Sequence, residues 1–145
     1  MLKKAHDASV SDFVQAIGLL VRRVRAAGAV QEVSWSQMSV MKRLDTVGPA
    51  TIADLARAES VKPQSMGTTI AALEEMGMVE RTAHPTDGRQ MNIRLTAKGA
   101  AERKRTHDAR QAWIIRAISQ LDEHEQHTLF AAGEIMRRLV ERDGQ

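Results

Sequence analysis

Small uncharged polar residues gather on one side of a helix expected between Pro63 and Met76. Met66, Ile70 and Leu73 recur at helical spacing, which predicts that they face inward and that polar residues face outward. The outward residues are Gln64, Ser65, Thr68 and Thr69. A glutamine can make two hydrogen bonds to adenine in the major groove of DNA, and serine or threonine can hydrogen-bond several bases. The pattern favours a helix that contacts base edges over an ordinary solvated face, for which more lysine and glutamate would be expected.

A turn-rich segment follows this helix and carries an arginine. Residues 84–90 (His-Pro-Thr-Asp-Gly-Arg-Gln) lie between two strand-like runs, Met78–Thr82 and Met91–Leu95, and this order predicts a β-hairpin. Arg89 lies near the tip of that hairpin. An arginine held there can enter an A·T-rich minor groove, where the negative potential is strongest. The alternative is a plain surface turn.

Charge around the hairpin supports a nucleic-acid interface. The net charge of the chain is +3, and residues 79–105 contain seven basic side chains against three acidic ones, so the positive excess is concentrated there. We expect phosphates to be contacted by Lys62, Arg94 and Lys98. Within the turn, Asp87 would brace the loop by pairing with Arg81 or Arg89.

The elements that must position these residues have recognisable ends. Thr51, with Asp54 three residues later, resembles a helix N-cap, and Pro63 suits a first helical position. A helix over Thr51–Ala58 and one from Pro63 are joined by only Glu59–Lys62, which forces a steep crossing. Gly77 can end the second helix in a left-handed conformation. Followed by the hairpin, this is the outline of a winged helix-turn-helix.

These residues resemble the multiple antibiotic resistance regulator (MarR) family. The resemblance rests on residues 73–81 (Leu-Glu-Glu-Met-Gly-Met-Val-Glu-Arg), on Pro85–Arg89 and on Leu95–Gly99. The wing signature is Asp-x-Arg followed by Leu-Thr-x-x-Gly. The departures from the family pattern are Glu59 where an apolar residue is usual, Ser60 where glycine is usual, and Lys62 in place of a serine or threonine cap.

The rest of the chain is predicted to be helical. Ser34 and Gln37 resemble a capping box, which opens a helix whose inner face would hold Trp35, Met38, Met41 and Leu44. The apolar residues of the terminal helices exceed what one small winged domain can cover, so we expect a two-fold homodimer that reads a palindrome. The fold class is therefore mainly α with a small β-hairpin wing, in a single MarR-like domain over residues 1–145. Residues 34–99 form the DNA-binding module, and residues 1–33 and 100–145 form interlocking dimerisation helices.

The resemblance also implies a small-molecule pocket between the dimerisation helices and the winged module. The candidate residues are Arg22, Arg23, Trp35, Met38, Met41 and Trp113. They offer apolar walls and a cation for an aromatic carboxylate or a phenol. The alternative is that tryptophan and methionine at helical spacing simply fill the core.

Other chemistry has little support in the sequence. The chain has no cysteine, which excludes disulfides and thiolate metal sites. His124 and His127 are three residues apart, but a solvated corner explains them better than a metal site, so neither a metal nor a cofactor is expected. No nucleophile elbow or phosphate-binding glycine loop is present, so an enzyme is not expected.

The sequence predicts a sequence-specific transcriptional regulator, a repressor, that binds double-stranded DNA as a homodimer. With no apolar run long enough to span a bilayer and no secretion signal, we expect no membrane association and a cytoplasmic location. The alternative function is a winged-helix dimer that serves as a protein-interaction scaffold or a non-specific architectural DNA binder.

Overall fold

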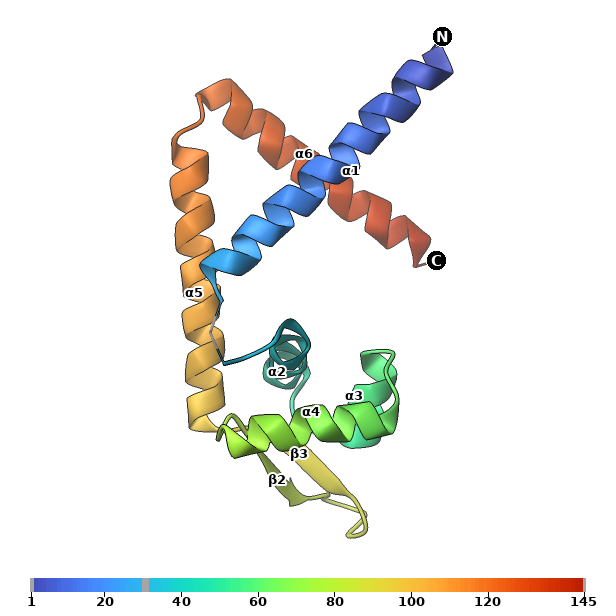
Figure 1. Cartoon of the computed structure of the whole chain (residues 1–145), viewed down its shortest axis with the longest axis vertical. Coiled ribbons are helices and arrows are strands. Elements are labelled where there is room, and N and C mark those ends of the chain that lie inside the picture. The colour runs from blue at the N-terminus through green and yellow to red at the C-terminus, as the bar shows by residue number, and fades with distance from the viewer. Residues whose placement is uncertain (1, 30–31, 145) are drawn as a thin grey trace.

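The computed structural model describes residues 2–29 and 32–144, so residues 1, 30–31 and 145 of the expected dimerisation segments lie outside the described residues. Within this part of the chain there are six helices and a small three-stranded sheet (Figure 1). The helices are α1 (Leu2–Ala27), α2 (Trp35–Val47), α3 (Ile52–Ala58), α4 (Pro63–Glu75), α5 (Ala97–Ser119) and α6 (Glu123–Asp143). The strands are β1 (Ala50–Thr51), β2 (Val79–Ala83) and β3 (Met91–Leu95). The predicted fold class is confirmed.

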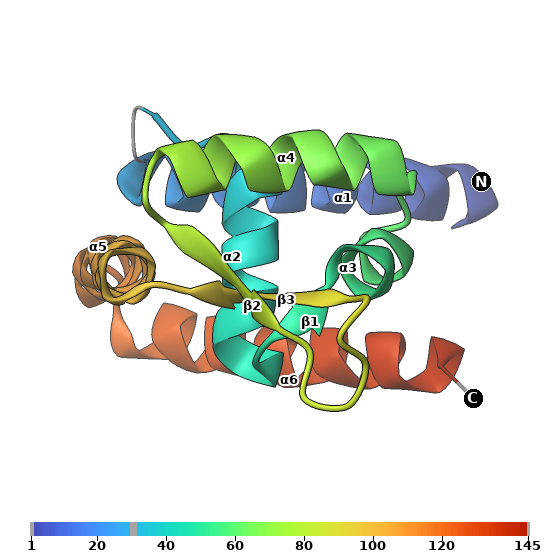
Figure 2. The same cartoon turned by 90° about the horizontal axis from the view of Figure 1, so that it is seen from below.

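The elements divide between the two ends of an elongated molecule. In Figure 1, α2, α3 and α4 lie with the sheet at the lower end, and α5 runs from there to the upper end. There α6 begins and runs away from α5, whereas the C-terminal end of α1 lies beside the middle of α5. The two helices cross in Figure 1 but are well separated in Figure 2, so they lie at different depths. The helices α2, α3 and α4 and the sheet are thus connected to the terminal helices α1 and α6 mainly through α5.

The core fills the space between α2, α3, α4 and the sheet. Its buried apolar side chains are Met38, Val40, Met41, Leu44, Leu55, Ala56, Met66, Ile70, Leu73, Met78, Val79 and Ile93. Helical spacing predicted the inward positions of α2 and α4, with one error. Trp35 is 51% exposed because it is the first residue of α2 and lies beyond the edge of this core.

The sheet is antiparallel, with strand order β1-β3-β2. In the predicted hairpin, Val79 pairs with Leu95 and Ala83 pairs with Met91. The sequence did not predict β1, in which Ala50 pairs with Ile93, because a strand of two residues carries no alternating pattern. The strand β1 fixes the chain immediately before α3, and so anchors the helix-turn-helix on the hairpin.

The ends of α3 and α4 follow the local signals in the sequence. The Thr51 hydroxyl accepts a hydrogen bond from the backbone N–H of Asp54 (3.1 Å), which caps α3. Pro63 is the first residue of α4. Gly77 has a φ of +75°, and its N–H and that of the next residue bond back to carbonyls in the last turn of α4. This arrangement is a Schellman motif, which glycine adopts without strain.

The start of α5 docks directly on this turn. The backbone N–H of Thr96 donates to the carbonyl of Met78 (3.0 Å), and the Thr96 hydroxyl donates to the carbonyl of Gly77. Lys98 Nζ donates to the carbonyl of Met76 (2.8 Å). The end of α4 and the start of α5 are therefore held together by hydrogen bonds to three successive carbonyls.

Substitution of Gly99 tests this docking. A Cβ at Gly99 would lie 2.0 Å from the carbonyl oxygen of Met78, and backbone cannot yield as a flexible side chain can. Gly99→Ala should lower the free energy of unfolding by roughly 2 kcal/mol through overpacking, as measured by chemical denaturation at fixed protein concentration. Gly67→Ala in α4 is the matched control, because no described atom outside its own stretch of helix lies within 4 Å of the added Cβ. The control should gain about 0.5–1 kcal/mol from helix propensity. A Gly99→Ala variant as stable as the wild type would contradict the docking.

Candidate nucleic-acid interface

The polar face of α4 points to solvent. Gln64, Ser65 and Thr68 are exposed, and Thr69 is half-buried. The Thr68 hydroxyl donates to the carbonyl of Gln64 (3.2 Å) and the Thr69 hydroxyl to that of Ser65 (3.1 Å). Each hydroxyl oxygen keeps lone pairs that can accept a hydrogen bond from a base. All four predicted base-contact residues therefore share one accessible stretch of helix.

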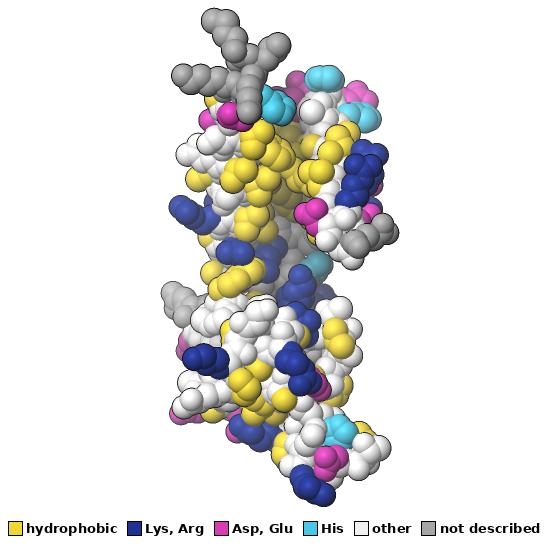
Figure 3. All heavy atoms as spheres, turned by 90° about the vertical axis from the view of Figure 1, so that its right-hand side faces the viewer, with side chains coloured by type: hydrophobic (Ala, Val, Ile, Leu, Met, Phe, Trp, Pro, Cys, Tyr) yellow, Lys and Arg dark blue, Asp and Glu magenta, His cyan; other side chains and the backbone are white. Residues whose placement is uncertain are grey.

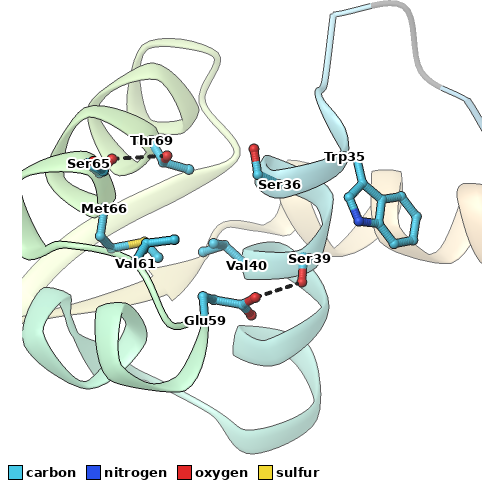
Figure 4. A pocket seen from close by; sticks show the side chains of 9 residues that line it. All are labelled: Trp35, Ser36, Ser39, Val40, Glu59, Val61, Ser65, Met66 and Thr69. Carbon is cyan, nitrogen blue, oxygen red and sulfur yellow. Dashed lines mark hydrogen bonds between the residues drawn. The ribbon is translucent and has the colours of Figure 1, made fainter.

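The turn before α4 contains a half-buried carboxylate. Glu59, which stands where the family has an apolar residue, has a side chain only 20% exposed. It accepts hydrogen bonds from Arg43 Nε (3.0 Å) and from the Ser39 hydroxyl (3.0 Å), both on α2, and Figure 4 shows the bond from Ser39. Ser60, where glycine is usual, has a φ of +56°. The turn thus keeps the left-handed residue of the pattern and replaces an apolar contact with an ion pair to α2.

A cavity of about 300 Å³ lies beside this turn, between α2 and α4. Val40, Val61 and Met66 point toward one another in it (Figure 4). Its remaining lining residues are Trp35, Ser36, Ser39, Glu59, Ser65 and Thr69. Among the described residues, no lysine or arginine lines it, so its chemistry does not suit a phosphate.

The wing carries Arg89 on its exposed tip, with a loop braced through the backbone. Asp87 Oδ1 accepts the backbone N–H of Arg89 (3.1 Å). The expected pairing of Asp87 with Arg81 is wrong, because Arg81 Nε instead donates to Glu74 at the end of α4 (3.1 Å). Arg81 therefore supports the wing by joining β2 to the recognition helix.

The three predicted phosphate-binding residues differ in their surroundings. Lys62 is exposed at the N-cap of α4 and makes no side-chain capping bond. Arg94 forms an ion pair with Glu80 across the hairpin. Lys98 donates a hydrogen bond to the carbonyl of Met76, the C-cap residue of α4, but remains exposed. Figure 1 shows that the hairpin and α4 lie together at the lower end of the molecule, so these cations lie at the same end as the polar face of α4.

The predicted effector-pocket residues are divided by the structure. Trp35 and Met38 line a cavity of about 230 Å³ together with Arg25, Val33, Ser34 and Arg110. Met41 is fully buried in the core, and so is not available to a ligand. Arg23 stacks on Trp113, 4.9 Å from the ring centroid, as a separate pair, and Arg22 is exposed. Met41, Arg22, Arg23 and Trp113 are therefore not among the described residues that line this cavity with Trp35.

The cations beside Trp35 were not predicted. The guanidinium of Arg25 lies 3.5 Å and that of Arg110 5.6 Å from the centroid of the Trp35 ring. Burial lowers the pKa of Arg110, and repulsion from Arg103 and Arg25 lowers it further. Among the described residues, Arg110 Nε and the hydroxyl of Thr106 are buried without a hydrogen-bond partner. Two guanidinium groups therefore lie at this cavity, that of Arg25 exposed and that of Arg110 half-buried.

The histidine pair lies at the start of α6. His127 Nδ1 is 2.8 Å from the carbonyl of Glu123, four residues earlier. This contact within the helix uses one of the two ring nitrogens. Within the described residues, no group of three or more histidine, cysteine or acidic side chains is arranged to hold a metal ion.

Comparison with known proteins decides the family. The model of the MarR family matches residues 33–91, from just before α2 to the start of β3. An HTH-type transcriptional regulator of Mycobacterium tuberculosis is 37% identical over 131 residues, which are 90% of this chain and 92% of that protein. The chain belongs to the MarR family. An HTH-type transcriptional repressor of the same organism is 31% identical over 118 residues, covering 81% of this chain and 85% of the repressor.

Solved structures agree with this MarR-family assignment. The crystal structure of RV1404 from M. tuberculosis is similar with a TM-score of 0.83 and 25% identity, over 91% of this chain and 92% of that one. A variant of S. aureus MepR bound to an oligodeoxyribonucleotide shares the fold, with a TM-score of 0.72 and 18% identity over 91% and 97% of the two chains. MarR-family proteins are DNA-binding transcriptional regulators and not enzymes, and this MarR-family chain is one of them. None of its described helices is long and apolar enough to cross a membrane.

The ion pair between Arg43 and Glu59 can be tested with a double-mutant cycle. Arg43→Ala and Glu59→Ala should show a coupling energy of about 1 kcal/mol, because this pair is partly desolvated. The pair of Asp54 and Arg57 is the matched control, since its side chains are 54% and 74% exposed, and it should couple by less than about 0.5 kcal/mol. Thermal and chemical unfolding of the single and double variants give both values. Equal coupling in the two pairs would show that Glu59 does not fasten the turn to α2.

Proposed function

We propose that this MarR-family regulator represses transcription by binding a pseudo-palindromic operator as a homodimer. One observation carries the proposal: the uncharged face of α4 and the wing arginine lie together at one end of the molecule, and exposed apolar faces lie at the other. The relatives named repressors and the DNA-bound MepR variant support it. Action on chromosomal DNA would place the protein in the cytoplasm.

The reading end suits duplex DNA. In the proposed complex, Gln64, Ser65, Thr68 and Thr69 enter the major groove, where uncharged side chains can discriminate between bases. Arg89 reaches the adjacent minor groove. Phosphates flanking the grooves are bound by the cations around α4, which are Lys62, Arg94 and Lys98. Arg94 then shares its guanidinium between Glu80 and a phosphate.

The opposite end suits a second copy of the chain. On α1, Val10, Phe13 and Val14 are between 47% and 61% exposed. On α6, Phe130 and Leu139 are 57% and 56% exposed. Figure 3 shows hydrophobic side chains gathered over this upper part of the molecule. Apolar patches of this kind mark protein interfaces, and a two-fold pairing would bury both helices while it holds two copies of α4 at a fixed distance.

A small anionic effector suits the cavity beside Trp35. Arg25 and Arg110 supply two guanidinium groups against one aromatic ring, and a carboxylate there would give the buried Arg110 Nε an acceptor. The cavity is built from α1, α2 and α5, so a ligand contacts both the dimerisation helices and the reading module. If it fits one spacing of the two reading ends better than another, it changes DNA affinity by that difference. The proposed effector is an aromatic carboxylate.

The wing is tested with Arg89→Ala. Loss of the minor-groove contact should weaken binding to the operator roughly tenfold, while the melting temperature and the dimer stay unchanged, because the Arg89 side chain is exposed. Arg116→Ala, which removes one positive charge from the far end of α5, is the matched control and should retain affinity. Fluorescence anisotropy on labelled operator gives the comparison. Equal affinity of the Arg89→Ala variant and the control would remove the wing from the mechanism.

The effector site is tested with benzoate as the probe. Saturating benzoate should raise the melting temperature of the protein and weaken operator binding by about fivefold or more. Arg110→Gln should abolish both effects, and Arg22→Gln should keep them, since Arg22 is exposed and outside the cavity. Benzoate that changes neither quantity in the wild-type protein would contradict the site.

A further inference from the structure

The wing tip is organised around the ring of one histidine. His84 Nδ1 lies 3.1 Å from the backbone nitrogen of Asp87 and 3.3 Å from that of Thr86. The Thr86 hydroxyl lies 3.4 Å from the same ring nitrogen. Three potential donors therefore converge on a single atom.

This geometry defines the protonation state of the ring. A backbone N–H can only donate, so Nδ1 must accept, and the ring proton must be on Nε2. A doubly protonated imidazolium has no acceptor. Because histidine changes its charge near neutral pH, protonation would replace these contacts with opposed donors.

The contacts continue from His84 to the wing arginine. Asp87, whose N–H is held by the ring, accepts the N–H of Arg89 through its own side chain. The backbone of Gln90 closes the loop, with His84 N donating to the Gln90 carbonyl (3.2 Å) and Gln90 N donating to the Asp87 carbonyl (3.1 Å). The backbone direction at Arg89 thus depends on Asp87, and that of Asp87 depends on His84.

We propose that neutral His84 is a positioning residue that holds the wing tip in the form that presents Arg89 to DNA, so that protonation of its ring weakens operator binding. The proposal rests on the proposed role of the wing. It makes DNA binding sensitive to mild acid through a residue that touches no base.

The charged groups of the hairpin that carries the ring lie in its loop and on its two strands. Asp87 and Arg89 belong to the loop itself. On the two strands that carry it, Arg81 pairs with Glu74 and Arg94 pairs with Glu80. DNA phosphates would favour a charged ring and so strengthen binding in acid, the opposite of the predicted direction. The sign of the pH effect therefore separates positioning by His84 from simple charge attraction.

The test compares His84→Asn and His84→Ala with the wild type. An asparagine oxygen can accept the same backbone N–H groups, as in an Asx turn, but it does not titrate. At about pH 7.5, His84→Asn should bind operator within about twofold of the wild type, and His84→Ala should bind about fivefold more weakly, the loss of roughly one hydrogen bond. As the pH is lowered from about 7.5, the wild type should lose affinity relative to His84→Asn, up to the roughly fivefold loss expected of His84→Ala.

Nuclear magnetic resonance on the DNA-free protein gives a readout that does not need the operator. The imidazole nitrogens of His84 should report the Nε2–H form, and the amide signals of Thr86 and Asp87 should titrate with the ring in the wild type and stay fixed in His84→Asn. Absence of this titration, or equal operator affinity of His84→Asn and His84→Ala, would overturn the proposal. A wild type that gains affinity in acid relative to His84→Asn would also overturn it. If the free wing titrates as expected while Arg89→Ala binds normally, the failure lies in the wing's role in DNA binding, and the positioning proposal falls with it.

Discussion

The proposed function of this molecule depends on the hydrogen-bonded joint between α4 and α5. Three successive carbonyls, those of Met76, Gly77 and Met78, receive hydrogen bonds from Thr96 and Lys98. The two segments are tightly packed, because Gly99 lies so close to the Met78 carbonyl that even a Cβ would overlap it. A rotation of α5 must therefore be accompanied by a rotation of the turn that ends α4. The helix α5 and the C-terminal end of α4 therefore move as one rigid body.

The other contacts of α5 show which parts of the molecule can shift this helix. Along its length α5 packs against α1 and α2, and the cavity beside Trp35 lies at that meeting point with Arg110 of α5 on its wall. The two guanidinium groups at this cavity could both make charge-assisted hydrogen bonds to a bound anion. The proposed dimer interface, the proposed ligand site and the proposed DNA-binding end are all connected to α5. Coupling between them then needs only small rigid-body shifts, which a two-fold dimer converts into a change in spacing between two copies of α4.

How far the sequence could anticipate this structure depends on whether each feature is local. Helical spacing and end signals such as Thr51, Pro63 and Gly77 located the helix-turn-helix, because caps and positive-φ turns are set by neighbouring residues. The contacts of Glu59 could be anticipated only in part: a carboxylate at a usually apolar position requires a partner, but nothing in the spacing identifies Arg43 on another helix. Arg110 could not be paired with Trp35 from the sequence because the two are 75 residues apart, and Arg25 could not because it lies on a different helix. The role of His84 is visible only once the loop geometry brings its ring to two backbone N–H groups.

Selection of bound duplexes from a random DNA pool, followed by the salt dependence of binding to the selected site, tests the central claim most directly. A dimer whose two recognition helices are held by α1 and α6 should select a two-fold symmetric sequence with half-sites about one helical turn apart. It should bind that sequence at least about a thousandfold more tightly than scrambled DNA of the same composition. Recovery of no motif, or of binding that follows ionic strength alone, would contradict the account and would leave a scaffold or a non-specific architectural protein.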